Sequence, residues 1–245
     1  MEVHAHSHTA RKKWTHYFWE FIMLFLAVFC GFLAEYQLEH KIEKEREKQF
    51  IMSMVEDIEK DTSNLRISIE SFNRQDKYFD TVFSLFSQLN KEYNHSLHTS
   101  MMSLMGWKSF VATDKTLQQL KYAGGMRMIR KRKAADAIAG YDALLRVHEG
   151  DNQELQQAHS GVSNKLTEFY NLQALAISQS GDSYNTIEKG KNNYLLKNDA
   201  VSLGQYYNVL AIYRILRGVV VNSMDKLQIA AIELIRTLKD EYNMK

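Results

Sequence analysis

The apolar segment KKWTHYFWEFIMLFLAVFCGFLAEY, at residues 12–36, constrains this chain more than any other feature. Its uncharged run, Phe21 to Ala34, has 14 residues, a length that suits a signal-peptide core or a buried helix as well as a membrane span. A helix from Trp14 to Tyr36 has 23 residues and rises roughly 34 Å, which is enough to cross a hydrocarbon core of about 30 Å. Aromatic side chains, which favour the headgroup region, lie near both ends of this helix: Trp14, Tyr17, Trp19 and Tyr36. The segment therefore predicts a transmembrane helix.

Signal-peptide cleavage is the alternative, and it requires small residues at the last and third-last positions before the cut. Cleavage after Ala34 would place Phe32 at the third-last position, and cleavage after Gly31 would place Phe29 there. A lipoprotein signal at Cys30 meets the same obstacle, because the bulky Phe29 precedes the cysteine. These residues favour an anchor that stays in the membrane over a signal that is removed.

Basic residues beside the helix indicate its orientation, because cytoplasmic flanks are enriched in lysine and arginine. Arg11, Lys12 and Lys13 directly precede the helix, whereas an acidic residue, Glu35, comes first on the other side. Farther along the chain the basic residues are nearly balanced, so only the immediate flanks carry this argument. We expect residues 1–13 to form a short cytoplasmic tail and the chain beyond the helix to lie outside the cytoplasm, in the periplasm if the protein is bacterial.

Composition predicts long helices in the rest of the chain. The 245 residues include 11 glycines and no proline, and a proline costs about 3 kcal/mol in a helix interior. The net charge of +2 gives no reason to expect a nucleic-acid partner. Residues 37–50 carry opposite charges three and four positions apart, a spacing at which they meet on a helix surface, and they predict a charged helical stalk.

Beyond the stalk, core-facing positions recur at alternating spacings of four and three, the pattern of helices that pack along one face. The first series is Ile51, Val55, Ile58, Thr62, Leu65, Ile69, Phe72, Asp76, Phe79, Phe83 and Phe86. The second is Ile138, Tyr141, Leu145, His148, Asn152, Leu155, His159, Val162, Leu166 and Phe169. The third follows Asp199, a candidate helix cap, and comprises Leu203, Tyr206, Leu210, Tyr213, Val220, Met224, Leu227, Leu234 and Leu238. We predict an all-α fold with a transmembrane helix at 14–36, a stalk at 37–50 and, at 51–245, an elongated bundle of about three long helices.

Two irregular regions separate these long helices. Residues 90–133 contain a short helical stretch at about 114–122, the Gly124-Gly125 pair and the basic run RMIRKRK. Residues 179–198 are rich in Asn, Ser and Gly and predict a long turn.

The residues FWEFIMLFLAVFCGFLAEYQLEHKIEKEREKQFIMSMVEDIEKD, together with the later TLQQLKYAGGMRMI, resemble an uncharacterised family of bacterial single-pass inner-membrane proteins. Members of that family have a short cytoplasmic tail and a helical extracytoplasmic domain. The resemblance covers about the first 60 residues well, the Gly-Gly segment loosely and the end of the chain not at all. It implies the anchor, the topology and the inner membrane, but no active site, because the family has no known function.

Glu20 is the one ionisable residue inside the predicted transmembrane helix apart from its ends, and such residues are functional candidates. It lies about 9 Å of helix rise beyond Trp14, where a carboxyl group still reaches the headgroups. A proton-linked or helix-pairing role and simple interfacial placement remain alternatives.

Five basic side chains form the densest charge cluster of the chain: Arg127, Arg130, Lys131, Arg132 and Lys133. Such a cluster suits contact with the phosphates of lipid or lipopolysaccharide, or with the acidic face of a partner protein. An ordinary solvated surface is the alternative.

Histidines mark two further places. His4, His6, His8 and His16 have a spacing that suits a divalent metal, although a terminal tail offers no outer groups to orient them. His148, Asn152 and His159 occupy core positions of the second series, where polar side chains need hydrogen bonds. They favour control of helix register over a ligand pocket, because no carboxylate or cysteine completes a ligand set. We expect no bound metal or other cofactor.

The apolar stripe Ile51, Val55 and Ile58 lies next to the stalk. If the returning helices do not reach this level, the stripe is left in water, and exposed stripes of this kind usually bind a partner. We therefore expect self-association through these three residues.

No catalytic signature is present, since Cys30 lies in the predicted span and no glycine-rich phosphate loop follows a strand. We expect a protein without enzymatic activity that contacts the lipid bilayer, other envelope proteins and copies of itself. A membrane-anchored scaffold or adaptor is the preferred function, and a sensory or ligand-binding bundle outside the cytoplasm is the alternative. The sensory interpretation is less favoured, because the sequence predicts no second membrane span. Asp225, Lys226 and Glu233 interrupt the last apolar stretch. A further alternative, a subunit of an ion-driven membrane assembly, rests on Glu20 alone.

Overall fold

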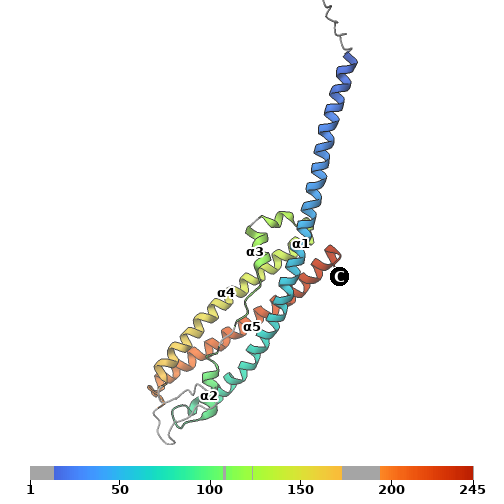
Figure 1. Ribbon diagram of the computed structural model, residues 1–245. Coiled ribbons are helices and arrows are strands. Elements are labelled where there is room, and N and C mark those ends of the chain that lie inside the picture. Colours follow the sequence, from blue (N-terminus) through green and yellow to red (C-terminus); the bar gives the residue numbers. More distant parts are fainter. Residues whose placement is uncertain (1–13, 107–108, 123, 173–193, 245) are drawn as a thin grey trace, which may run out of the picture. The chain divides into compact units, whose positions relative to one another are not determined.

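The computed structural model describes residues 14–106, 109–122, 124–172 and 194–244, which form an all-helical fold (Figure 1). The α-helices of this described part are α1 (Trp14–Leu85), α2 (His95–Ser103), α3 (Lys115–Tyr122), α4 (Arg132–Phe169) and α5 (Ala200–Tyr242). Two short 3-10 helices, η1 (Phe86–Gln88) and η2 (Gly125–Met128), follow α1 and α3. The described residues contain no strand beyond a single bridge between Tyr170 and Leu195. The predicted all-α class is confirmed.

The chain divides into two units, residues 1–50 and 51–245, and α1 contributes to both. In the first unit the side chains from Trp14 to Glu39 are exposed, except for the half-buried Ile22. Even the large apolar side chains are uncovered, with Phe21 and Phe32 each 64% exposed. Among the described residues this is the one helix long and apolar enough to cross a membrane.

The second unit is a helical bundle built from α1 after Ile51, α4 and α5 (Figure 1). Helices α1 and α5 run in opposite directions, because Glu59 pairs with Lys239 while the later Asp80 pairs with the earlier Arg214. The apolar positions of the three predicted series line the core; those with no exposed surface include Leu65, Phe79, Leu155, Val162, Tyr213 and Val220. The predicted three long helices are therefore present, and most apolar positions of the predicted faces are buried; Ile69, Phe83, Phe86 and Leu203 are half-buried.

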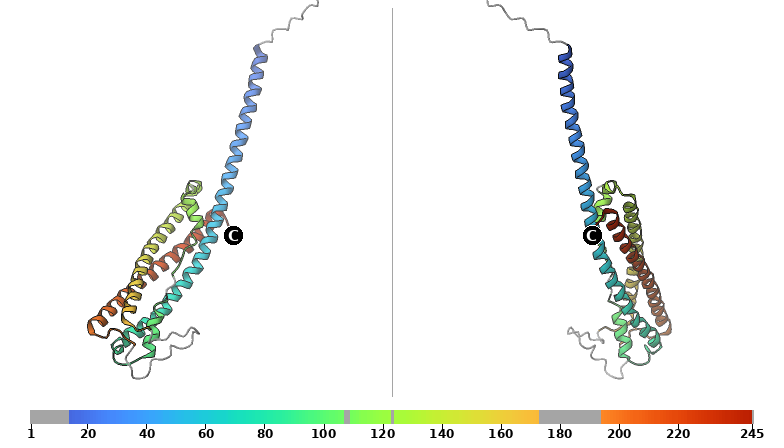
Figure 2. Two further views of the ribbon diagram at one scale, coloured as in Figure 1. Left: turned by 60° about the vertical axis from the view of Figure 1, so that its left-hand side comes forward. Right: turned by 90° about the vertical axis from the view of Figure 1, so that its right-hand side faces the viewer.

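Between α1 and α4 the chain returns along the bundle without a long helix. Figures 1 and 2 show α2 near the end where α1 stops and α3 near the end where α4 begins. The described residues 104–106 and 109–114, here called the crossing segment, connect them. Helix α3 matches the predicted stretch at 114–122. Helix α2 was not predicted, because its nine residues are too short to show a series. Its N-cap is Asn94, whose side chain accepts a hydrogen bond from the Leu97 amide.

The expectation of an exposed stripe at Ile51, Val55 and Ile58 is wrong. These side chains are 0%, 6% and 2% exposed. The cause is the length of the returning helices: Lys239, near the end of α5, lies 2.8 Å from the Glu59 carboxylate of α1. The stripe belongs to the bundle core, so it offers no surface for self-association.

The predicted cap of the last long helix is confirmed. The Asp199 carboxylate accepts a hydrogen bond of 2.9 Å from the Ser202 amide at the start of α5, which lowers the pKa of Asp199. Most of the predicted turn at 179–198 lies outside the described residues.

Candidate functional site

Two carboxylates one helical turn apart hold the crossing segment and α3 against α1. Asp61 accepts a hydrogen bond from the Thr113 amide at 2.7 Å. Asp57 accepts two from Thr116, one from its amide at 3.2 Å and one from its hydroxyl at 2.6 Å. Both carboxylates are buried, and Asp57 acts as the cap of the short helix α3. They fasten the part of the chain that has no long helix of its own.

Helix α4 holds the crossing segment from the other side. His159 Nε2 lies 3.0 Å from the Met105 carbonyl oxygen, and the Ser109 hydroxyl donates to the Asn152 side-chain oxygen at 2.6 Å. His159 and Asn152 are two of the three polar residues predicted to lie in the core series. The third, His148, is 2% exposed and places Nδ1 3.0 Å from the Ser223 hydroxyl of α5. The three side chains are thus used in separate structural hydrogen bonds, and their role in setting helix register stays a prediction.

Burial sets the electrostatics at Asp61. Desolvation raises the pKa of this carboxyl group, although hydrogen bonds from Thr113 and Tyr141 oppose the shift. The Tyr141 hydroxyl donates to Asp61 at 3.1 Å, and burial together with the Asp61 charge raises the pKa of Tyr141. Both shifts disfavour ionisation, as expected for a buried hydrogen-bonded pair that holds structure together.

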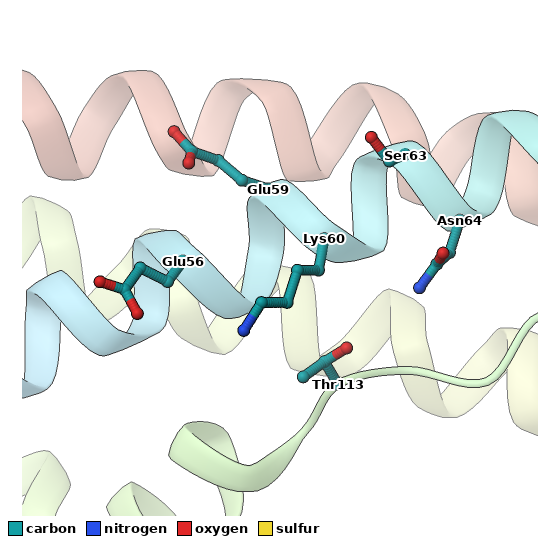
Figure 3. A pocket seen from close by; sticks show the side chains of 6 residues that line it. All are labelled: Glu56, Glu59, Lys60, Ser63, Asn64 and Thr113. Carbon is teal, nitrogen blue, oxygen red and sulfur yellow. The ribbon is translucent and has the colours of Figure 1, made fainter.

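A shallow hollow of about 550 Å³ lies beside the contacts of Asp57 and Asp61 with α3 and the crossing segment and opens to solvent. Its lining residues are Glu56, Glu59, Lys60, Ser63, Asn64 and Thr113. Figure 3 shows that the first five project from α1, with Lys60 and Asn64 on the side where Thr113 of the crossing segment lies. The lining combines both signs of charge with small polar groups.

A buried arginine lies near the middle of α5. Arg217 is 2% exposed, and its guanidinium carbon lies 4.4 Å from the centre of the Phe72 ring and 5.4 Å from that of Phe79. Its Nη2 donates to the Phe72 carbonyl oxygen at 3.0 Å. The nearest carboxylate oxygen recorded for it is that of the half-exposed Asp76, at 4.0 Å. Aromatic faces therefore provide most of the surroundings of this charge.

Aromatic rings enclose His98 of α2. The His98 ring stacks on Tyr93 with 4.7 Å between centres and an angle of 9°, and meets the Tyr194 ring edge to face. Its Nδ1 lies 2.9 Å from the Tyr170 hydroxyl, while Nε2 is buried with no hydrogen-bond partner among the described residues. Burial, with a smaller effect of His95, lowers the pKa of His98 to about 4. His98 is therefore neutral at physiological pH.

The acidic candidate of the apolar helix has a partner within its own helix. Glu20 lies 3.2 Å from His16 Nε2, one turn earlier, and both side chains are about half exposed. This contact is consistent with interfacial placement. A proton-linked role for Glu20 stays a prediction.

The basic cluster surrounds the junction between η2 and α4. Arg127 and Arg130 are exposed, and the Lys131 Nζ atom lies 4.6 Å from the centre of the Tyr242 ring. Arg132 pairs with Asp136 at 3.6 Å, and Lys133 pairs with Glu241 at 3.7 Å. Arg132 and Lys133 therefore have acidic partners in the bundle, and contact of the cluster with an external anion stays a prediction.

The histidine-rich tail, with His4, His6 and His8, lies outside the described residues. Within the described ranges no group of three or more His, Cys, Asp or Glu side chains is arranged to hold a metal ion.

Sequence reasoning missed Asp57, Asp61, His98 and Arg217. Arg217 had a detectable signal, because it follows Tyr213 by four residues and precedes Val220 by three, which is the spacing of the third series. Asp61 had a weaker one, since it falls between Ile58 and Leu65 on the buried side of α1. His98 had none, because α2 shows no series.

Comparison with known proteins adds no assignment. No protein-family model, curated protein or solved structure matches this chain.

Proposed function

We propose that this protein is a membrane-anchored helical scaffold or adaptor of the bacterial envelope. Residues 14–36 span the inner membrane, the N-terminus is cytoplasmic, and the bundle lies in the periplasm, where it binds other envelope proteins. The proposal includes no catalytic step and no nucleic-acid partner.

The observation that carries this proposal is the contrast between the two units. Residues 14–39 leave nearly every side chain uncovered by protein, including a run of large apolar ones, which is favourable in lipid and costly in water. The bundle, in contrast, buries most of its apolar series and uses Asp57, Asp61, Asn152 and His159 to hold its own crossing segment. Such a bundle supports a role that depends on its outer surface.

Protease accessibility and membrane extraction test the proposed anchor and its orientation. Protease added to spheroplasts degrades the part beyond Tyr36 if the bundle is periplasmic, and alkaline washing leaves the intact chain in the membrane fraction. Protection of the bundle until the cells are lysed would show the opposite orientation.

Partner binding is tested by photo-crosslinking in native membranes. A photoreactive amino acid at Val147, which is 57% exposed on α4, is compared with one at the exposed Glu154 on the same helix. A scaffold gives discrete adducts with the same envelope proteins in repeated experiments, at one position more than at the other. A bundle that gives no protein adduct at any exposed position would contradict the scaffold.

A sensory or ligand-binding bundle is the second candidate, and the hollow beside Thr113 supports it (Figure 3). A ligand there would touch both α1 and the crossing segment. Native mass spectrometry of the purified full chain tests this function: a small molecule that is retained by the wild type and lost in Lys60→Ala would favour sensing over the scaffold.

A further inference from the structure

Helix α5 carries a second repeating pattern, on the face opposite to the one it buries in the bundle. Its members, here called the outer stripe, occur at every seventh residue: Val201, Asn208, Ile215, Asn222 and Ile229. All five are exposed, and the three apolar ones are 70%, 67% and 69% exposed. Three exposed β-branched side chains in strict register are unusual on a helix that already has a complete buried face.

The flanks of the outer stripe differ in size. On one side lie Ile212 and Val219, which are 55% and 41% exposed. On the other side lie Gly204, Ala211 and Gly218, and a Cβ atom added at either glycine meets nothing within 4 Å. Large side chains on one flank and open space on the other suit the close approach of a second helix.

The pattern fits a copy of itself. When two α5 helices lie parallel and in register, each stripe residue faces its counterpart, so apolar side chains meet apolar side chains. Asn208 then faces Asn208 and Asn222 faces Asn222, and an amide pairs well with an amide because it both donates and accepts. In parallel coiled coils, Val or Ile at the a position of the heptad, with Leu at d, favours two strands, and Asn at an a position specifies the register. The outer stripe has Val, Ile and Asn at the equivalent of the a position, with small residues in place of Leu.

Charge does not oppose this pairing. Between Val201 and Ile229 the charged residues on this side of α5 are Asp225 and Lys226, adjacent in sequence and opposite in sign. In a parallel pair the Asp225 of each copy lies near the Lys226 of the other, so the contact is self-complementary.

We propose that the outer stripe of α5 binds the same stripe of a second copy of this chain, in parallel and in register. The inference rests on the proposed membrane anchor in one respect: a stripe this narrow binds weakly in solution, and a shared bilayer raises the effective concentration to the millimolar range. A common bilayer also gives both copies the same orientation, which selects the parallel pair. The stripe replaces Ile51, Val55 and Ile58 as the self-association surface.

Disulfide crosslinking in native membranes tests the pair in the full chain. Cys30 is changed to Ser, and single cysteines are introduced by Asn208→Cys, Asn222→Cys and, as a control on the exposed face of α4, Gln157→Cys. Under mild oxidation, Asn208→Cys and Asn222→Cys each form disulfide-linked dimers, and Gln157→Cys does not. Adding Ile215→Lys to Asn208→Cys lowers dimer formation by about a hundredfold, because each copy loses an isoleucine that the proposed pair would bury. Unchanged circular dichroism shows that the bundle is intact, since Ile215 is 67% exposed.

Two results would overturn the proposal. Crosslinks that form only when Asn208→Cys and Asn222→Cys are co-expressed would mean antiparallel pairing centred on Ile215. Stripe cysteines that crosslink no better than Gln157→Cys would mean that the stripe does not bind a second copy, whatever else covers it. In that case a chain still found in the membrane fraction leaves the scaffold proposal standing, whereas a chain absent from it contradicts the anchor itself.

Discussion

Arg217 offers a direct measurement of what a buried charge contributes to this bundle. Its side chain is 2% exposed, lies against the rings of Phe72, Phe79 and Tyr213, and has no carboxylate within ordinary hydrogen-bond distance. Replacing one partner of a buried interaction is costly when it leaves another group unsatisfied. Here the Phe72 carbonyl keeps the hydrogen bond of its own helix, so the aromatic contacts and the packing volume decide the result.

Two substitutions separate volume from charge. Arg217→Ala removes two buried methylene groups, worth about 0.8 kcal/mol each, and cation–π contacts worth about 1–2 kcal/mol, but it also removes the cost of burying a charge. We expect a net loss of about 2–4 kcal/mol in the free energy of unfolding. Arg217→Met keeps most of the volume, places sulfur against the rings and buries no charge, so its free energy of unfolding stays within about 1 kcal/mol of the wild type or exceeds it.

Urea denaturation of the full chain in mild detergent, followed by far-ultraviolet circular dichroism, measures both differences. Asp76→Asn serves as the control, because its carboxylate is half exposed and 4.0 Å away and contributes less than about 1 kcal/mol. If Arg217→Met loses as much stability as Arg217→Ala, the guanidinium itself stabilises the bundle and the reasoning from volume is refuted.

Three further predictions use the same denaturation assay. Asp57→Ala lowers the free energy of unfolding by about 1–2 kcal/mol, because α3 loses its cap. Glu56 is exposed, so Glu56→Ala changes this free energy by less than about 0.5 kcal/mol. Equal effects of the two substitutions would contradict the capping role of Asp57. The pKa of His98 is about 4 in the folded state, so the unfolded state binds more protons below pH 6.5. This difference lowers the free energy of unfolding by about 3 kcal/mol between pH 6.5 and 4, and His98→Phe removes that part of the pH dependence. An unchanged pH profile in the variant would exclude a contribution from His98. Gly125→Ala lowers the free energy of unfolding by about 1–3 kcal/mol, because the added Cβ would lie 2.9 Å from the Leu120 Cα atom. Gly140→Ala, whose Cβ meets nothing within 4 Å, raises it by up to about 1 kcal/mol. A larger loss in Gly140→Ala than in Gly125→Ala would contradict the close packing of Gly125 on Leu120.

The sequence by itself determined the features that depend on neighbours along the chain. The apolar helix follows from the composition of residues 14–36, and the three long helices follow from their apolar series and the absence of proline. The Asp199 cap and the short helix α3 were also predictable, because capping and helix propensity act over a few residues.

Only the tertiary structure decided what each surface meets. Ile51, Val55 and Ile58 show the same spacing whether a returning helix covers them or not, and the reach of α5 to Lys239 is what buries them. Asp57 and Asp61 are ordinary helix-surface residues until the crossing segment brings Thr113 and Thr116 to them. The outer stripe of α5 has a pattern that is legible in the sequence, but only the fold shows which of the two faces of α5 is buried and which remains exposed. Spacing along a helix fixes which residues share a face, whereas burial depends on the segments packed against that face, and those segments lie far away in the sequence.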